Sequence, residues 1–168
     1  MLEMMRNRRS IRKFEDRPVE KEKLDAIIEC ALRSPSSMGK RPWKIWTVKD
    51  RADLEKIAKA KPHGLDFVAG APVAFIVAGY PDAADVWIED CSIVSIVLQL
   101  EAEMLGLGSC WGQIRRRMYD SSTSSSDYLK SAMGLDSDCE VLSIIAVGYK
   151  DEEKKGHSGI PSEKAINK

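Results

Sequence analysis

The chain has 168 residues, and its 26 basic and 26 acidic residues give a formal net charge of zero. This length favours a single domain that buries its own core without a disulfide or a metal. The balanced charge argues against a dedicated nucleic-acid binder, which normally carries a marked basic excess. Four isolated cysteines and two histidines lack the spacing of a zinc site, and no uncharged apolar run approaches the roughly 20 residues that cross a bilayer. We therefore expect a cytoplasmic protein with reduced thiols, no bound metal, no nucleic acid and no membrane contact.

Hydrophobic periodicity predicts helices and strands that alternate along the chain. In chain order they are a helix at 24–32, a strand at 44–48, a helix at 54–58, a strand at 72–78, a helix at 85–105, a strand at 109–111, a helix at 127–133 and a strand at 141–147. The strand at 72–78 is apolar throughout, which indicates burial on both faces. The helix at 85–105 is apolar around its circumference in the middle, so we expect it to be central and buried on most sides. Interleaved elements predict an α/β-like or α+β fold, followed from residue 150 by a polar tail without a core of its own.

The first candidate site is the basic N-terminal segment, residues 8–14, which reads Arg-Arg-Ser-Ile-Arg-Lys-Phe. Six basic and two acidic residues lie between Arg6 and Arg17, whereas residues 81–114 contain six acids and no Lys or Arg. The planar guanidinium groups of arginine match phosphate oxygens, and Ser10 adds a hydroxyl donor. The segment favours a site for a phosphorylated cofactor, although a solvated basic loop is the commoner role of such a run.

Two further segments are rich in groups that can contact a ligand. Residues 34–43 combine hydroxyls, exposed backbone donors and Trp43, and they fit a polar turn before a strand equally well. Residues 106–113 contain glycines that let backbone approach a flat ligand, but they follow a helix and lack the spacing of a dinucleotide-binding turn. The sequence shows no catalytic triad, P-loop or metal cluster, and Cys110 is better explained as a structural thiol. These features indicate a cofactor that brings its own reactivity.

Taken together and in this order, the segments resemble the nitroreductase family of FMN-dependent oxidoreductases. The similarity rests on Arg-Arg-Ser-Ile-Arg-Lys-Phe at 8–14, Ser-Pro-Ser-Ser and Arg-Pro-Trp within 34–43, Gly-Ala-Pro-Val at 70–73, Gly-Leu-Gly-Ser-Cys-Trp at 106–111 and Ala-Val-Gly-Tyr at 146–149. It extends from about Met5 to Tyr149. The resemblance implies an α+β fold with a central mixed β-sheet flanked by helices, and a homodimer with two FMN sites at its interface. It also implies one FMN-binding domain at residues 1–149 and a polar tail at 150–168 that can cross onto the partner subunit.

The resemblance further implies which residues contact FMN. They are Arg8, Arg9, Ser10 and Arg12 at the phosphate and ribityl chain; Pro35, Ser36, Ser37 and Gly39 in a loop from the partner subunit; the backbone of Gly112 and Gln113 at the isoalloxazine ring; and Lys154 and Lys155 as further phosphate contacts. No catalytic side chain and no metal ligand is expected.

Two positions in the loop depart from the family pattern. Gly39 stands where the family usually has an asparagine that donates to the flavin ring, and its absence removes one hydrogen bond worth about 0.5–1.5 kcal/mol. Arg41 replaces a glutamine and brings positive charge that favours the anionic reduced flavin. The chain is also short for the family and lacks an insertion that often shapes the substrate pocket.

The resemblance implies an oxidoreductase that passes electrons from NAD(P)H through FMN to a nitroaromatic or a quinone by a ping-pong mechanism. Positioning and flavin electronics then replace a side-chain nucleophile or base. Two alternatives stay open. One is a reductive or flavin-processing enzyme of the same fold with a narrow substrate range, and the other is a non-catalytic FMN-binding or storage protein.

Overall fold

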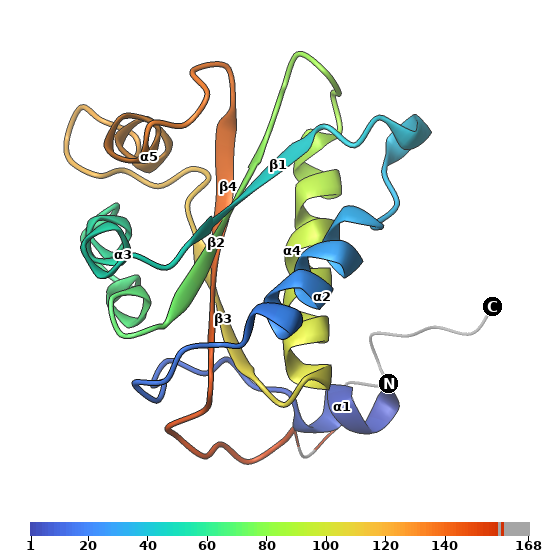
Figure 1. The fold of residues 1–168 in the computed structure, drawn as a ribbon. Coiled ribbons are helices and arrows are strands. Elements are labelled where there is room, and N and C mark those ends of the chain that lie inside the picture. Colours follow the sequence, from blue (N-terminus) through green and yellow to red (C-terminus); the bar gives the residue numbers. More distant parts are fainter. Residues whose placement is uncertain (158, 160–168) are drawn as a thin grey trace.

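A four-stranded antiparallel sheet forms the centre of the computed structural model, which describes residues 1–157 and 159 (Figure 1). The strands are β1 (Trp43–Val48), β2 (Val73–Gly79), β3 (Gly108–Gln113) and β4 (Glu140–Gly148), and their order across the sheet is β1-β2-β4-β3. All seven residues of β2 are buried, as the uninterrupted apolar run predicts for a strand covered on both faces.

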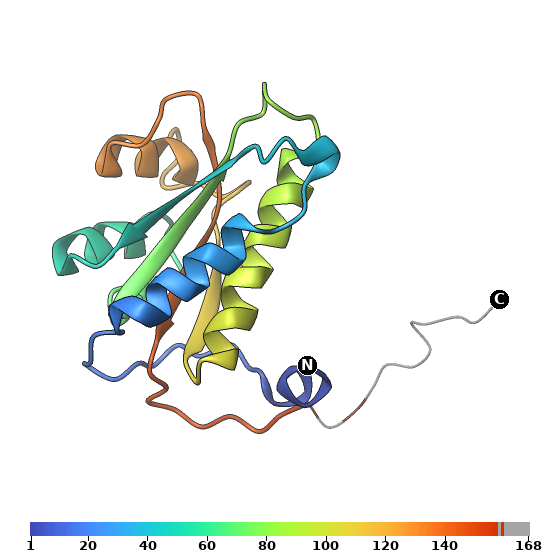
Figure 2. The same ribbon diagram turned by 45° about the vertical axis from the view of Figure 1, so that its right-hand side comes forward.

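Helices cover both faces of the sheet (Figure 2). They are α1 (Leu2–Asn7), α2 (Lys21–Leu32), α3 (Arg51–Ala58), α4 (Trp87–Met104) and α5 (Ser125–Met133), with short 3₁₀ turns η1 (Ser37–Gly39) and η2 (Asp66–Val68). One face packs against α2 and α4, and the opposite face packs against α3, α5 and η2, so the structure has two hydrophobic clusters separated by the sheet. The expected α+β fold with a sheet flanked by helices is confirmed.

The strand pairing differs from that of the expected mixed sheet, which would contain both parallel and antiparallel pairs. All three strand pairs are antiparallel, and among the described residues the parallel pairing is an isolated bridge between Ser10 and Ser109. This bridge attaches the basic N-terminal segment to the start of β3. It leaves the rest of the outer edge of β3 without a neighbouring strand.

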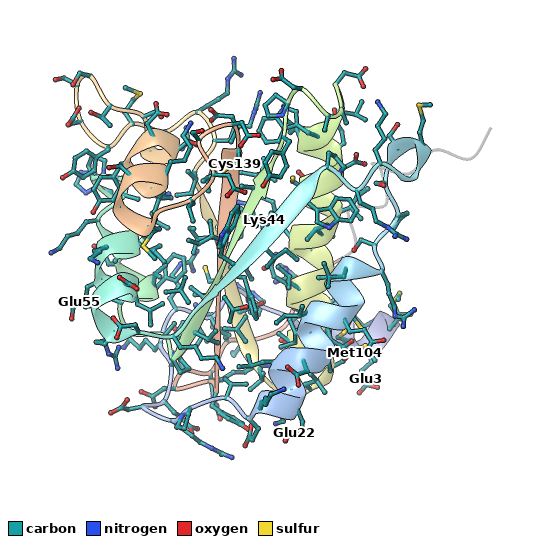
Figure 3. The ribbon with its side chains drawn as sticks, turned by 45° about the horizontal axis from the view of Figure 1, so that its top comes forward. Glu3, Glu22, Lys44, Glu55, Met104 and Cys139 are labelled. Atoms are coloured by element: carbon teal, nitrogen blue, oxygen red, sulfur yellow. The ribbon has the colours of Figure 1, made fainter. Side chains whose placement is uncertain are left out.

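The long helix α4 is buried less completely than its apolar middle predicts. Val94 and Leu98 are fully buried against the sheet, but Ile96 is 38% exposed and Met104 is 70% exposed. The reason is that the sheet and α2 cover two sides of α4, while the described part of the chain leaves its third side open. Figure 3 shows Met104 at the C-terminal end of α4, the end beside which α1 lies in both ribbon views.

Helix α1 has no counterpart among the predicted elements. It is six residues long and buries none of them, so it lacks the hydrophobic period that marks a helix in sequence. The other helix boundaries have identifiable local causes. For example, Ser124 caps α5 by accepting the Asp127 amide at 3.0 Å, and Gly134 ends it in a left-handed conformation with φ of 62°.

Candidate functional site

The basic N-terminal segment and the C-terminal tail lie side by side, although more than 130 residues separate them in sequence. The Asp151 amide donates to the Lys13 carbonyl at 3.0 Å, and the His157 amide donates to the Arg6 carbonyl at 2.9 Å. Residues 150–157 of the tail therefore dock on their own chain. The tail expected to cross onto a partner subunit spans residues 150–168, of which 158 and 160–168 lie outside the described residues, and this crossing stays a prediction.

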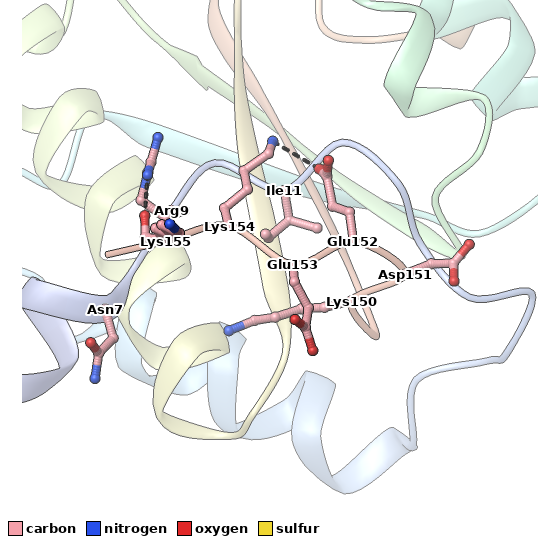
Figure 4. A pocket seen from close by; sticks show the side chains of 9 residues that line it. All are labelled: Asn7, Arg9, Ile11, Lys150, Asp151, Glu152, Glu153, Lys154 and Lys155. Atoms are coloured by element: carbon pink, nitrogen blue, oxygen red, sulfur yellow. Dashed lines mark hydrogen bonds and ion pairs between the residues drawn. The ribbon is translucent and has the colours of Figure 1, made fainter. Parts of the chain in front are cut away.

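Between these two segments lies a cavity of about 950 Å³ (Figure 4). Its lining combines one apolar side chain with cationic, acidic and amide groups, contributed by Asn7, Arg9, Ile11, Lys150, Asp151, Glu152, Glu153, Lys154 and Lys155. The structure thus brings together Arg9, Lys154 and Lys155, three residues that the sequence assigns to one phosphate site.

Backbone carbonyl groups hold the cations of this cavity in place. The Arg9 guanidinium donates to the Lys155 carbonyl, and the Lys154 ammonium donates to the Ser10 carbonyl at 2.7 Å. Carbonyl acceptors carry no full negative charge, so these two bonds orient the cations without neutralising them.

Glu152 joins the tail to the basic N-terminal segment, a role that the sequence analysis did not assign. Its carboxylate accepts the backbone amides of Arg12 and Lys13, the latter at 3.3 Å, and pairs with the Lys154 ammonium at 2.9 Å. The Arg12 amide, and after it the Lys154 ammonium, lower the pKa of Glu152 to about 2. Because the contact joins positions 140 residues apart, no local pattern in the sequence could have revealed it.

At the junction of the basic N-terminal segment and β3, Arg8 Nε and Ser109 Oγ are buried without a partner among the described residues; so is Glu103 Oε2, whose carboxylate pairs through its other oxygen with the cavity residue Lys150 at 2.6 Å. A buried polar atom without a partner costs free energy, so native structures rarely retain one unless a ligand or water completes it. Ser109 lies directly opposite Ser10, and its carbonyl accepts the Ile11 amide at 2.9 Å. Arg8 Nε and Ser109 Oγ therefore offer unused hydrogen-bonding capacity at the junction of the basic N-terminal segment and β3.

The outer edge of β3 presents free backbone donors beyond this junction. The Ser109 carbonyl bonds to Ile11 on the side away from β4, and backbone groups of alternate residues in an antiparallel strand point to the same edge. The amides of Trp111 and Gln113 consequently point outward too. The Gln113 side chain is already engaged, since it accepts from Trp111 Nε1 and donates to the Arg115 carbonyl, both at 3.0 Å. Backbone at this edge, rather than the Gln113 side chain, is available to a ligand.

Core packing leaves no room for a side chain at Gly112. A Cβ on Gly112 would lie 2.3 Å from Leu65 Cδ2, and one on Gly108 would lie 2.8 Å from Ile11 Cβ. Our sequence interpretation, that these glycines let backbone approach a flat ligand, is therefore not needed to explain them.

The loop with Pro35, Ser36, Ser37 and Gly39 lies at the other end of the molecule. The Ser37 amide donates to Asp90 Oδ1 at 3.0 Å, which ties the loop to the N-terminal end of α4. The basic N-terminal segment lies near the C-terminal end of α4 (Figures 1 and 2). At 1.5 Å per residue this helix is about 27 Å long, more than a mononucleotide spans. One chain therefore does not bring the two groups of predicted contacts together.

The backbone of this loop explains one departure from the family pattern. Met38, Gly39 and Arg41 all have positive φ, at 52°, 67° and 47°. Glycine and asparagine enter this left-handed region more readily than other residues, so Gly39 preserves the backbone shape and removes only the side-chain amide. The Arg41 amide donates to Ser36 Oγ at 2.9 Å, which stabilises the turn.

The three buried cysteines carry no reactive thiol. All four cysteines of the chain are free of disulfides, and burial raises the pKa of the buried Cys110, of Cys91 to about 12 and of Cys139 to about 11. Thiols of this kind stay protonated near neutral pH, in agreement with the structural role expected for Cys110. Within residues 1–157 and 159, no group of His, Cys, Asp or Glu side chains is arranged to hold a metal, and no helix is both long and apolar enough to span a membrane.

Within the described residues the structure thus combines a helix-covered sheet with a cavity lined by cations and carboxylates at one end and an open edge of β3 beside it. The chain belongs to the nitroreductase family, whose model matches residues 5–63 and 59–149.

Individual relatives agree with this assignment. A protein of Archaeoglobus fulgidus, provisionally named NADH dehydrogenase/NAD(P)H nitroreductase, is 31% identical over 157 residues, which cover 91% of this chain and 87% of the relative. A protein of Methanothermobacter thermautotrophicus with the same provisional name is 42% identical over 114 residues, or 66% of this chain. This match spans only 59% of that relative's length.

A solved structure, described as an FMN-dependent nitroreductase from Clostridium difficile, shares the fold over its whole length. It is 40% identical, its TM-score is 0.97, and the comparison covers 99% of this chain and 98% of that chain.

Proposed function

We propose that this protein is an FMN-dependent oxidoreductase that transfers electrons from NAD(P)H to an electron-poor small molecule of the nitroaromatic or quinone type. The observation that carries the proposal is the cavity between the basic N-terminal segment and the tail, which Arg9, Lys154 and Lys155 line together with acidic side chains; Arg8 Nε beside it is buried without a partner among the described residues. Membership in the nitroreductase family and the FMN-dependent relative of the same fold support the choice of cofactor.

The residues around the cavity fit the anionic end of FMN. Arg8, Arg9 and Lys154 supply positive charge near the phosphate, and Ser10 lies beside them. Charge-assisted hydrogen bonds from guanidinium and ammonium groups are the usual means of holding a phosphate. Arg12 and Lys155 complete the proposed phosphate site. Further along β3, the outward amides of the strand edge, including that of Gln113, are suited to the polar rim of the flavin ring.

The protein is proposed to act as a homodimer, because one chain lacks a complete site. The loop with Ser36 and Ser37 is too far from the cavity in its own chain, so its contact with flavin requires a partner subunit. The exposed apolar side chains of α4, Ile96 and Met104, together with Leu2 of α1, support an interface on this side.

When bound, FMN supplies the hydride-accepting and electron-transferring chemistry, and NAD(P)H and the acceptor occupy the same cleft in turn. The protein then has to bind, orient and exclude water, and it needs no nucleophile or general base. The buried, protonated thiol of Cys110 agrees with this division of labour. Four unpaired cysteines are also what we expect of a protein that works in the reducing cytoplasm, the location that we propose.

The test is to add NADH or NADPH to the FMN-loaded protein without oxygen and to record the visible absorption band of oxidised flavin. We expect loss of the band with at least one nucleotide and its return when a nitroaromatic or a quinone is added after the nucleotide is consumed. No loss with either nucleotide would support the FMN-storage alternative. Reoxidation by one acceptor out of a broad panel would favour the narrow-substrate enzyme.

A further inference from the structure

Three consecutive arginines, Arg115, Arg116 and Arg117, follow β3 after a single intervening residue and lie outside the proposed flavin contacts. Over the described part of the chain, none of their guanidinium groups forms an ion pair with a carboxylate. Arg116 and Arg117 are exposed, and Arg115 is half-buried. This cluster is therefore an uncompensated concentration of positive charge on a protein whose total charge is zero.

Lys61 adds a fourth cation to the arginine cluster. Partial burial lowers the pKa of Lys61, and the nearby Arg117 guanidinium lowers it further. The same ammonium group lies within electrostatic reach of Cys110 on β3. Neither Lys61 nor Arg117 forms an ion pair with a carboxylate among the described residues, so an anion bound near both would stabilise these two like charges.

The backbone of the arginine cluster is fixed by hydrogen bonds. The Arg115 amide donates to the Leu142 carbonyl at 3.0 Å, and the Arg117 amide donates to the Ile114 carbonyl at 2.9 Å. The Ser125 amide in turn donates to the Arg117 carbonyl at 2.9 Å, which anchors the cluster to the start of α5. The positions from which the three side chains extend are thus set by the fold.

Acidic residues close in sequence to the cluster are already engaged elsewhere. The Asp120 carboxylate accepts the amides of Ser122 and Thr123, both at 2.8 Å. Asp127 accepts from the Ser124 hydroxyl at 2.7 Å and pairs with Lys130 at 2.9 Å. Asp127 is therefore paired with another cation, and Asp120 is held in its own turn without an ion pair to the arginines among the described residues.

An aromatic surface adjoins the cluster. The rings of Tyr119 and Tyr128 stack with centroids 4.1 Å apart and an interplanar angle of 11°, and Tyr119 is 37% exposed. Tyr119 is two residues from Arg117. An exposed aromatic ring next to guanidinium groups offers both stacking and charge, the combination that suits a phosphorylated nucleoside.

The cluster also begins where the proposed flavin contacts end. The Gln113 side chain donates to the Arg115 carbonyl at 3.0 Å, so Arg115 is fixed beside the open edge of β3. A dinucleotide that places its nicotinamide on flavin at this edge extends its adenosine end away from the ring. The arginines lie within a few residues of the open edge of β3 and are therefore placed to bind the adenosine end of the dinucleotide.

We propose that Arg115, Arg116, Arg117 and Lys61 bind the 2′-phosphate of NADPH and make the protein prefer NADPH to NADH. NADPH differs from NADH only in that phosphate, and arginine forks match its oxygens. This inference rests on the proposed function, because it names the electron donor of the same flavin site.

The first test compares steady-state kinetics with NADPH and NADH for the FMN-loaded wild type and the double variant Arg116→Ala/Arg117→Ala. We expect the wild type to prefer NADPH by about tenfold or more, the ratio that charge-assisted contacts of this kind provide. The variant should lose most of this preference through a higher KM for NADPH, with kcat and the NADH kinetics nearly unchanged. The double variant Lys21→Ala/Arg33→Ala removes the same charge from two exposed positions, one at the start of α2 and one directly after its end, and should keep the preference.

The second test measures binding and needs no turnover. Calorimetric titration of the purified protein with adenosine 2′,5′-bisphosphate should show tighter binding than titration with adenosine 5′-monophosphate, and the arginine variant should lose the difference. Equal binding of the two nucleotides, a wild type that prefers NADH, or an equal loss with both donors in the variant would each overturn the inference. Failure of both donors to reduce flavin contradicts the proposed function instead, and the binding comparison still decides the inference.

Discussion

Arg8 and Arg12 flank Ser10 in the same short segment, yet the fold holds them differently. Arg8 is half-buried with an unpaired Nε, whereas Arg12 has an exposed side chain and a backbone amide that donates to Glu152. At the residue scale, the proposed phosphate site therefore combines Arg8, which lies beside β3, with cations whose positions depend on hydrogen bonds between the basic N-terminal segment and the tail.

Replacing both arginines tests this arrangement. Arg8→Ala/Arg12→Ala should fold, because neither side chain belongs to the hydrophobic clusters, and should purify without yellow colour because the FMN phosphate loses two cations. The flavin content per chain and the far-ultraviolet circular dichroism of the variant check both halves of this expectation. A folded variant that retains full flavin would remove these residues from the phosphate site.

The lowered pKa of Glu152 predicts how its contribution to stability depends on pH. Its pKa is about 2 in the folded chain against a usual 4.5, so its contribution is complete above pH 4.5 and is lost as the pH falls toward 2. The difference in thermal midpoint between wild type and Glu152→Gln should be largest above pH 4.5 and should vanish near pH 2.

Glu153→Gln is the matched control, since Glu153 lines the same cavity but is exposed and forms no ion pair within the described residues. It should leave the thermal midpoint unchanged. A Glu152→Gln difference that stayed constant from pH 7 to pH 2, values that bracket the titration of a carboxyl group, would show that the carboxylate charge is not responsible.

Some residues of the candidate site can be singled out from the sequence, and others only from the fold. Arg9 and Ser10 are predicted as phosphate contacts because they are contiguous in a recognisable motif, and this role stays a prediction although Arg9 does line the cavity. Glu152 could not, because its importance depends on amides that only the fold brings within reach. The sequence interpretation of Gly112 was that its backbone approaches a flat ligand, whereas in the structure the close approach of Leu65 is a sufficient reason for a glycine there.

At the scale of elements, the hydrophobic pattern predicts the helices and strands whose apolar side chains form the core. Strand β2 lies within one residue of its predicted bounds, and helix α2 ends at the predicted residue but begins three residues before the predicted start. Helix α1 and the docked part of the tail bury little apolar surface, so their positions depend on backbone hydrogen bonds that leave no periodic signal. The proposed domain boundary at residue 149 stays a prediction.

Truncation after Tyr149 tests that boundary. Because β4 ends at Gly148 and both hydrophobic clusters lie within residues 1–149, the shortened chain should fold. It should bind FMN at least about tenfold more weakly, because Lys154 and Lys155 are missing and one wall of the cavity is gone. Circular dichroism and a fluorescence titration with FMN measure the two effects. Unchanged affinity would exclude the tail from the cofactor site.

At the scale of the whole molecule, the central question is whether the protein works as a pair of chains. The two groups of predicted flavin contacts lie at opposite ends of α4, and the uncovered side of this helix is apolar. An interface on that side would bury exposed hydrophobic surface and supply each cavity with the missing loop. Assembly and cofactor binding would then be coupled.

Charges placed on this surface should separate the chains. Ile96→Glu/Met104→Glu introduces two carboxylates at positions that are exposed in one chain, so the monomer should still fold. Light scattering should show a dimer for the wild type and a monomer for the variant, and the monomer should have lost most of its affinity for FMN. A variant that stays dimeric would place the interface elsewhere.

The most direct measurement is an equilibrium titration of flavin-free protein with FMN, followed by the change in flavin fluorescence. The cavity, its cations and the unpaired Arg8 Nε predict saturable binding of one FMN per chain, weakened by salt because the phosphate contacts are ionic. Absence of binding, even after the protein is unfolded and refolded with FMN present, would contradict the account.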